Sequence, residues 1–246
     1  MMPLLSFGAE LEIRVIYDNT SAQPGIQEDW GYAALVDFRG HRILFDSGTK
    51  PDLFLTNLSK MQIDPASITQ AMISHEHRDH RSGIYKLYPL HRRLTTHFLD
   101  RFPAEAFAEA EQVGMTPRRV SGPMQLAPGL WTTGAIEGDP PEQSLVIETS
   151  KGLVLMTGCS HPGIVKIVQT VEKQRGVDSI RMLIGGFHLF RAGADEIDVM
   201  GNRLRALGVR RIVPAHCTGD LAKEKFAALW KDDYGTAGAG KRLVLD

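Results

Sequence analysis

The sequence has 246 residues, 43% of them hydrophobic, and a formal net charge of -1, with 28 Lys plus Arg against 29 Asp plus Glu. This balance provides no field that would steer nucleic acid or an anionic membrane surface, and the apolar fraction suffices for a substantial core. No run of about 18 apolar residues occurs, and Met1 to Glu10 do not resemble a targeting signal. We therefore expect a cytoplasmic globular protein with one domain over residues 1–246 and no nucleic-acid or membrane partner.

Hydrophobic periodicity and turn residues predict a run of strands followed by alternating strands and helices. The expected elements in chain order are strands at 11–17, 32–38 and 41–46, a helix at 51–61, a strand at 70–74, helices at 81–88 and 103–113, strands at 129–134, 144–150 and 152–158, a helix at 163–174, a strand at 179–186, a helix at 196–207, a strand at 210–216 and a helix at 221–230. Residues 114–128 have no clear pattern. This order predicts an α/β protein whose sheets are covered by helices on their outer faces.

Four of the expected strands end in side chains that can bind metal. The ends are followed by His75-Glu76-His77-Arg78-Asp79-His80, by Cys159-Ser160-His161, by Phe187-His188 and by His216-Cys217. Loops at strand ends are places where a rigid sheet can hold functional groups close together. The pattern therefore predicts a metal site at one edge of the sheets.

The spacing in the histidine loop suggests two cations. In an extended loop, His75 and His77 project to the same side and can bind one cation, whereas Asp79 and His80 come one turn later and suit a second. Imidazole and carboxylate ligands fit Zn, Fe or Mn, and two such ions can share a hydroxide that is nucleophilic at neutral pH. One loop cannot complete two coordination spheres. The missing ligands would be His161, Cys159 and His216.

Residues outside the histidine loop are candidates for stabilising the site, orienting its ligands or contacting substrate. Pro162 suits the first turn of a helix, so Ser160 or His161 would cap that helix, and its positive end would stabilise a thiolate at Cys159. Cys159 could equally be a buried thiol. Asp46, at the end of an earlier strand, is better suited to orienting a ligand imidazole than to binding metal itself. His188 either donates a hydrogen bond to substrate or fills a polar pocket.

The motif "SHEHRDH" after an apolar strand resembles the His-x-His-x-Asp-His loop of the metallo-beta-lactamase superfamily. The resemblance implies a four-layer αββα sandwich with the metal site at one edge. The matching positions are His75, His77, Asp79 and His80 in the motif, Asp46 as the early aspartate and His216 as the last histidine.

More of the chain is similar to one subfamily, the 7,8-dihydropterin-6-yl-methyl-4-(beta-D-ribofuranosyl)aminobenzene 5'-phosphate synthases. The similar segments are "YDNT", "ILFDSG", "GLVLMTGCSHPGIVKIV", "IGGFHL" and "PAHCTG", which lie between Leu11 and Gly219. The resemblance adds Asn19, within "YDNT", and His188, within "IGGFHL", to the catalytic or substrate-binding candidates.

Two positions depart from the superfamily pattern. Cys159 stands where hydrolases of this superfamily place a bridging aspartate. Because no histidine lies between His97 and His161, we expect His161 to replace a missing ligand and Cys159 to occupy the bridging position. Arg78, inside the loop, would favour an anionic group of the substrate such as phosphate.

These observations predict a metal-dependent hydrolase-like enzyme that acts on a phosphorylated or ester-like, anionic small molecule. Two divalent ions are expected, with Zn favoured over Fe or Mn, and a metal-bound hydroxide would attack while His188 transfers a proton or contacts the oxyanion. One alternative is the dihydropterin-linked synthase reaction, which releases diphosphate. Another is a non-catalytic metal-binding sensor or redox partner, which the cysteine at position 159 motivates.

A diiron oxidoreductase would need more carboxylate ligands than Glu76 and Glu142, neither of which follows a strand. The oligomeric state stays open.

Overall fold

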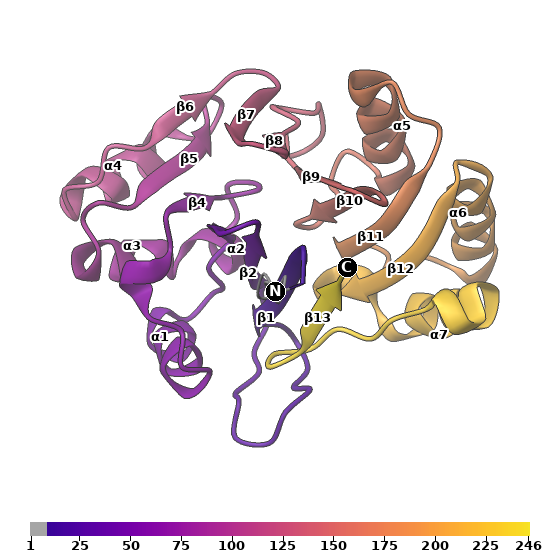
Figure 1. The fold of residues 1–246 in the computed structure, drawn as a ribbon, viewed down its shortest axis with the longest axis horizontal. Coiled ribbons are helices and arrows are strands. Elements are labelled where there is room, and N and C mark those ends of the chain that lie inside the picture. The colour runs from indigo at the N-terminus through magenta and orange to yellow at the C-terminus, as the bar shows by residue number, and fades with distance from the viewer. Residues whose placement is uncertain (1–8) are drawn as a thin grey trace, which may run out of the picture.

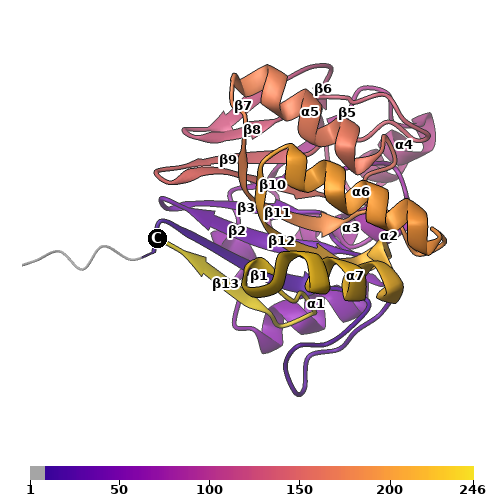
Figure 2. The ribbon, with the colours of Figure 1, turned by 90° about the vertical axis from the view of Figure 1, so that its right-hand side faces the viewer.

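The computed structural model describes residues 9–246, so nearly all of the N-terminal segment considered for a targeting signal lies outside it. Two β-sheets pack face to face, and helices cover the outer side of each (Figures 1 and 2). Among the described residues, no helix is both long and apolar enough to cross a membrane. The cytoplasmic location and the one-domain organisation stay predictions.

Apart from β13, which returns from the C-terminal end to the first sheet, each half of the chain supplies one sheet with its helices. The first sheet contains β1 (Leu11–Tyr17), β2 (Ala33–Phe38), β3 (His41–Phe45), β4 (Gln70–Met72), β5 (Thr95–Leu99), β6 (Arg118–Val120) and β13 (Arg242–Leu245), with helices α1 (Pro51–Lys60), α2 (Arg78–Arg81), α3 (Ile84–Leu87) and α4 (Ala104–Gln112). The second contains β7 (Met124–Ala127), β8 (Leu130–Thr132), β9 (Leu145–Thr149), β10 (Gly152–Thr157), β11 (Ile180–Gly186) and β12 (Val209–Ala215), with helices α5 (Ile164–Arg175), α6 (Ala194–Ala206) and α7 (Asp220–Trp230).

Strand pairing sets where the strand ends lie. The first sheet has the order β13-β1-β2-β3-β4-β5-β6 and the second the order β12-β11-β10-β9-β8-β7. β3, β4, β5 and β6 pair in parallel, and so do β10, β11 and β12. The carboxyl ends of each parallel set therefore meet at one edge of its sheet.

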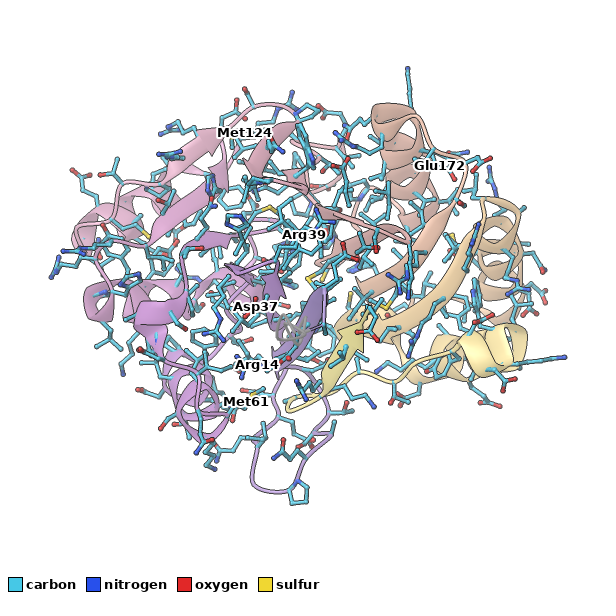
Figure 3. All side chains as sticks on the ribbon, viewed as in Figure 1. Arg14, Asp37, Arg39, Met61, Met124 and Glu172 are labelled. Carbon is cyan, nitrogen blue, oxygen red and sulfur yellow. The ribbon has the colours of Figure 1, made fainter. Side chains whose placement is uncertain are left out.

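The alternation of side chains along the strands separates three layers of core. On β3, Ile43 and Phe45 pack between the sheets, whereas Leu44 packs against the helices on the other face. On β10, Met156 faces the other sheet and Leu155 faces the outer helices. Side chains fill the space between the sheets, and α1 and α5 lie at opposite sides of the molecule (Figure 3). The predicted four-layer αββα sandwich is confirmed.

The differences from the predicted elements concern short or polar segments. β5 carries the buried polar residues Thr96 and His97, so it lacks the apolar alternation of a half-buried strand. β6 and β7 fall in the segment that had no clear pattern, and β13 is a four-residue edge strand. The helix expected at 81–88 is divided into α2 and α3. A Cβ at Gly83 would overlap the Ser47 carbonyl oxygen, so this close approach requires glycine.

Buried His97 predicts an acid-sensitive stability. Its ring is 1% exposed, its Nε2 lies 2.8 Å from Gln70 Oε1, and burial, with the charge of Arg118, lowers its pKa to about 4. In the unfolded chain, His97 therefore becomes protonated below about pH 6.5, whereas in the folded chain it stays neutral down to about pH 4. Metal-free protein should lose about 2 kcal/mol more unfolding free energy between pH 7 and pH 5 than the His97→Gln variant. Urea titrations at both pH values measure this difference, and equal losses would contradict it.

Candidate metal centre

Four strand ends converge on one region of the molecule. The segments that follow β4, β10, β11 and β12 carry the side chains that the sequence singled out, and the last three strands are parallel neighbours. Ser74 after β4 is tied to the second half of the chain, because its carbonyl accepts the Gln143 N–H at 2.9 Å. The two sheets thus hold the loops in a fixed relation.

The predicted metal ligands fall into two groups, and a third group in residues 9–246, formed by Cys159, His188 and Cys217, shares Cys159 with the second. The ligand atoms of His75, His77 and His161 all lie within 4.8 Å of one another, and the same holds for Asp79, His80, Cys159 and His216. The loop spacing predicts this division between the first and second pair of loop residues. The structure also brings His161 to the first group and His216 to the second, as expected for the ligands missing from the loop.

Two donor atoms of the first group, on His75 and His161, are in the state that a cation needs. Nε2 of His75 and Nε2 of His161 are buried and have no hydrogen-bond partner in the described structure. Burial, and then the neighbouring histidines, lower the pKa of His161 to about 3 and that of His75 well below its usual value. Both imidazoles are therefore neutral, which is the form that binds metal, and a buried nitrogen without a partner is costly. The two groups fit divalent ions of the Zn, Fe and Mn type.

Asp46 fixes the orientation of His80. Its Oδ2 lies 2.7 Å from His80 Nδ1 and accepts the Ser74 hydroxyl at 2.8 Å, while its Oδ1 accepts the Ser74 N–H at 2.7 Å. Burial alone would lower the pKa of His80, but the Asp46 carboxylate raises it to about 9. His80 Nε2 consequently faces the centre, 3.2 Å from both His216 Nε2 and Cys159 Sγ.

Asn19 and Asp18 fix the orientation of His216. Asn19 Oδ1 lies 2.9 Å from His216 Nδ1, and its Nδ2 donates to the His216 carbonyl at 3.2 Å. Asp18 Oδ1 accepts the His216 N–H at 2.8 Å. The Asn19 side chain thus positions the His216 ring, and the catalytic or substrate-binding role expected for Asn19 stays a prediction.

Backbone strain marks the same region. Seven non-glycine residues of the described chain have positive φ angles, and four of them belong to this centre: Asp46 (58°), Ser160 (67°), His188 (53°) and His216 (44°). Such conformations are costly and persist where the surroundings impose them, often at functional sites. The strand-end turns therefore adopt conformations that place these side chains, at a cost in local backbone energy.

Glu142 is a supporting residue that the sequence did not reveal. Its carboxylate is fully buried and accepts three backbone N–H groups, from Gly158 at 2.9 Å, Cys159 at 3.0 Å and His161 at 3.0 Å. Burial raises its pKa to about 7 in spite of these bonds. Glu142 lies in an irregular segment, so its role follows only from the tertiary structure. It holds the turn that presents Cys159 and His161.

Replacing Glu142 by Gln should disorder that turn. One carboxylate oxygen becomes an NH2 group that faces a backbone N–H, which leaves buried donors without an acceptor and costs about 1–3 kcal/mol. We expect a lower melting temperature and a reduced metal content per chain for Glu142→Gln. Glu137→Gln, which removes only a charge from an exposed pair with Arg101, is the matched control. Equal metal content in the two variants would contradict this role.

Cys159 lies where the second group needs a ligand. The thiol is 3% exposed, and burial raises its pKa well above the usual value. The expectation that a helix starts at Pro162 is wrong, because α5 begins at Ile164 after Gly163 with φ of 92°. The helix end is thus too far along the chain for Ser160 or His161 to cap it. A thiolate at Cys159 would depend on a bound cation, and its bridging role stays a prediction.

His188 and Arg78 differ in their relation to the centre. The exposed His188 ring lies 4.4 Å, centroid to centroid, from the His161 ring. Arg78 donates to Glu105 at 2.6 Å and to Glu109 at 2.5 Å, both on α4, and the structure does not bring it to the histidines. The Arg78 guanidinium thus joins α2 to α4, and its contact with a substrate stays a prediction. Among residues 9–246, no group of candidate ligands contains more than one carboxylate. The geometry therefore does not favour a diiron site.

Known proteins are similar to this chain in sequence or in fold. No protein-family model matches the chain. The sequence is 30% identical to the 7,8-dihydropterin-6-methyl-4-(beta-D-ribofuranosyl)-aminobenzene-5'-phosphate synthase of Methanocaldococcus jannaschii, over 81% of this chain and 83% of that protein. The crystal structure of Tm1679, a metal-dependent hydrolase of the beta-lactamase superfamily, matches with a TM-score of 0.81 and 29% identity over 96% of this chain and 100% of that one.

A more distant structure shares the fold alone. Human tRNase Z, short form, matches with a TM-score of 0.66 and 15% identity, over 96% of this chain and 99% of that one. The 30% identity over four fifths of both sequences and the shared fold agree with the histidine loop and with the two ligand groups. The chain belongs to the metallo-beta-lactamase superfamily, in the same family as the dihydropterin-linked synthase of M. jannaschii.

Proposed function

We propose that this protein is a metal-dependent, hydrolase-like enzyme that binds two divalent ions, preferably Zn, and acts on a phosphorylated or ester-like small molecule. The observation that carries the proposal is the convergence of seven ligating side chains in two adjacent groups, with buried histidine nitrogens that lack any other partner. The similarity to Tm1679, a metal-dependent hydrolase, supports it.

Different residues of the site would bind the metals, orient the ligands and transfer a proton. His75, His77 and His161 would hold one ion, and Asp79, His80, His216 and Cys159 the other. When bound, the ions would activate water and polarise a substrate oxygen. Asp46 and Asn19 keep two of the imidazoles oriented, and Glu142 keeps the turn before α5 in place. His188, exposed beside His161, is positioned to exchange a proton with the substrate.

A small set of chromogenic substrates tests this function. The protein, loaded in turn with Zn, Mn or Fe, is assayed with bis(4-nitrophenyl) phosphate, 4-nitrophenyl phosphate and 4-nitrophenyl acetate. We expect turnover with at least one of them, lost after chelation and restored by the metal. Two ions bound without turnover on any substrate would contradict the hydrolase proposal and favour a metal-binding sensor.

The synthase reaction is the second candidate, and the 30% identity to the M. jannaschii synthase favours it. In that case the diphosphate ester of a 6-hydroxymethyl dihydropterin would lose diphosphate while its methylene carbon bonds to an aminobenzene ribofuranosyl phosphate, which loses a proton. Diphosphate release that requires both substrates would establish the synthase. Release from the pterin ester alone would indicate hydrolysis.

A further inference from the structure

Two exposed aromatic side chains lie beside the candidate metal centre. Trp30 is 46% exposed and Phe190 is 40% exposed. Their ring centroids are 5.7 Å apart with an interplanar angle of 75°, an edge-to-face arrangement. Large aromatic side chains left in water forgo the stabilisation of burial, and a paired set beside a site is typical of a ligand-binding surface.

Trp30 contacts the second ligand group directly, and Phe190 lies next to His188, which contacts the first. The Trp30 ring lies 4.9 Å from the ring of His216, a member of the second group. The Phe190 ring lies 5.3 Å from that of His188, which in turn lies 4.4 Å from that of His161 in the first group. A molecule that reacts at the ions would therefore lie within reach of both Trp30 and Phe190.

The backbone holds both aromatic residues in place. Trp30 belongs to the loop between β1 and β2, which projects from the sheets in Figure 1, and its carbonyl accepts the Thr49 hydroxyl. The next residue, Gly31, donates its N–H to Asn19 Oδ1 at 3.1 Å. Phe190 donates its N–H to the Cys217 carbonyl at 3.3 Å. The pair is thus anchored to the same turns that position His216, so little ordering is needed on binding.

Arg191 adds a positive charge at this position. Its guanidinium carbon lies 5.2 Å from the Phe190 ring centroid, and the side chain is exposed. Arg78 is neutralised by two glutamates, whereas the ion pairs found in residues 9–246 do not include Arg191. A guanidinium free of carboxylates is suited to a phosphate or carboxylate of the ligand.

We infer that Trp30 and Phe190 bind a planar aromatic ring of the substrate, and that Arg191 binds its anionic group. The ligand class is accordingly a small aromatic or heteroaromatic anion. This inference rests on the proposed function, because it assigns substrate contacts to the same metal centre. Trp30 and Phe190 are specificity-determining residues rather than metal ligands, so their loss leaves the ions bound.

A matched pair of non-hydrolysable ligands tests the ring contact. Phenylphosphonate and cyclohexylphosphonate carry the same anion, but only the first has a flat π face. In isothermal titration calorimetry with zinc-loaded protein, we expect phenylphosphonate to bind about fivefold more tightly, as one or two aromatic contacts predict. Trp30→Ala and Phe190→Ala should reduce this ratio to below about twofold, and Trp30→Phe should retain it.

Further variants separate the two parts of the inference. Arg191→Gln should weaken both phosphonates by about tenfold and leave their ratio unchanged. Leu90→Ala, which truncates another exposed apolar side chain, is the control and should change neither affinity. Equal binding of the two ligands to the wild type would overturn the inference. So would a ratio that survives in the Trp30→Ala/Phe190→Ala double variant.

The outcome is distinguishable from failure of the proposed function. Binding of the phosphonates needs no turnover, so a ring preference without hydrolysis would overturn only the hydrolase proposal. Turnover without a ring preference would overturn only the aromatic contact. If the two aromatic residues instead bind a second copy of the chain, the double variant would lower the mass found by sedimentation equilibrium and leave the ligand ratio unchanged, which also overturns the inference.

Discussion

His77→Ala and Asp79→Asn should each bind one ion instead of two and lose at least about a thousandfold in turnover, because each change removes one ligand from a different group. Both side chains are partly exposed, so neither change opens a cavity in the core. Metal content is measured by elemental analysis after gel filtration, and turnover with the substrate found in the chromogenic screen. His91→Ala, which changes a histidine that belongs to neither group, should match the wild type.

The two variants also discriminate between an enzyme and a sensor. If the ions serve catalysis, activity and metal content fall together in both variants. If His77→Ala retained wild-type turnover, or if both variants kept two ions, the assignment of ligands to the two groups would be wrong. Two ions in the wild type and one in each variant, with no turnover in any of the three proteins, would favour the non-catalytic alternative.

Asp46→Asn should weaken metal binding without removing a ligand. The amide keeps the shape of the carboxylate but brings an NH2 group toward donors from Ser74 and His80, which lie 2.7 to 2.8 Å away. The His80 ring then loses the partner that fixes its orientation. We expect the affinity of the second group to fall by about 10- to 100-fold and the apoprotein to lose about 3 kcal/mol of unfolding free energy.

The measurement is a chelator competition titration together with urea unfolding of metal-free protein. Asp37→Asn is the matched control, since it makes the same change on β2 in the same sheet, where the carboxylate pairs with Arg42 at a partly exposed position. An Asp46→Asn protein with wild-type affinity for both ions would show that His80 needs no support from Asp46.

The histidine loop and its distant partners could be predicted from sequence because the rule involved is topological. β10, β11 and β12 are parallel neighbours, so the residues that follow them meet at one edge, however far apart they lie in the chain. The division of His75 and His77 from Asp79 and His80 also follows from local geometry, since the second pair lies in α2 and the first precedes it.

Other features depend on contacts that local sequence does not encode. Glu142 acquires its role from three amides on a turn that begins sixteen residues later, and Arg78 pairs with two glutamates of α4 that lie far from it in sequence. β5 escaped prediction because Thr96 and His97 interrupt its apolar pattern, although both are buried. The start of α5 depends on the positive φ of Gly163 rather than on Pro162.

We propose that two ions bind to two adjacent groups of ligands that share one centre, with Cys159 in the second group. The most direct test is elemental analysis of the protein as purified, related to the chain concentration. We expect two equivalents of divalent transition metal per chain, with zinc predominating. One equivalent or none after reconstitution with excess metal and gel filtration would contradict it.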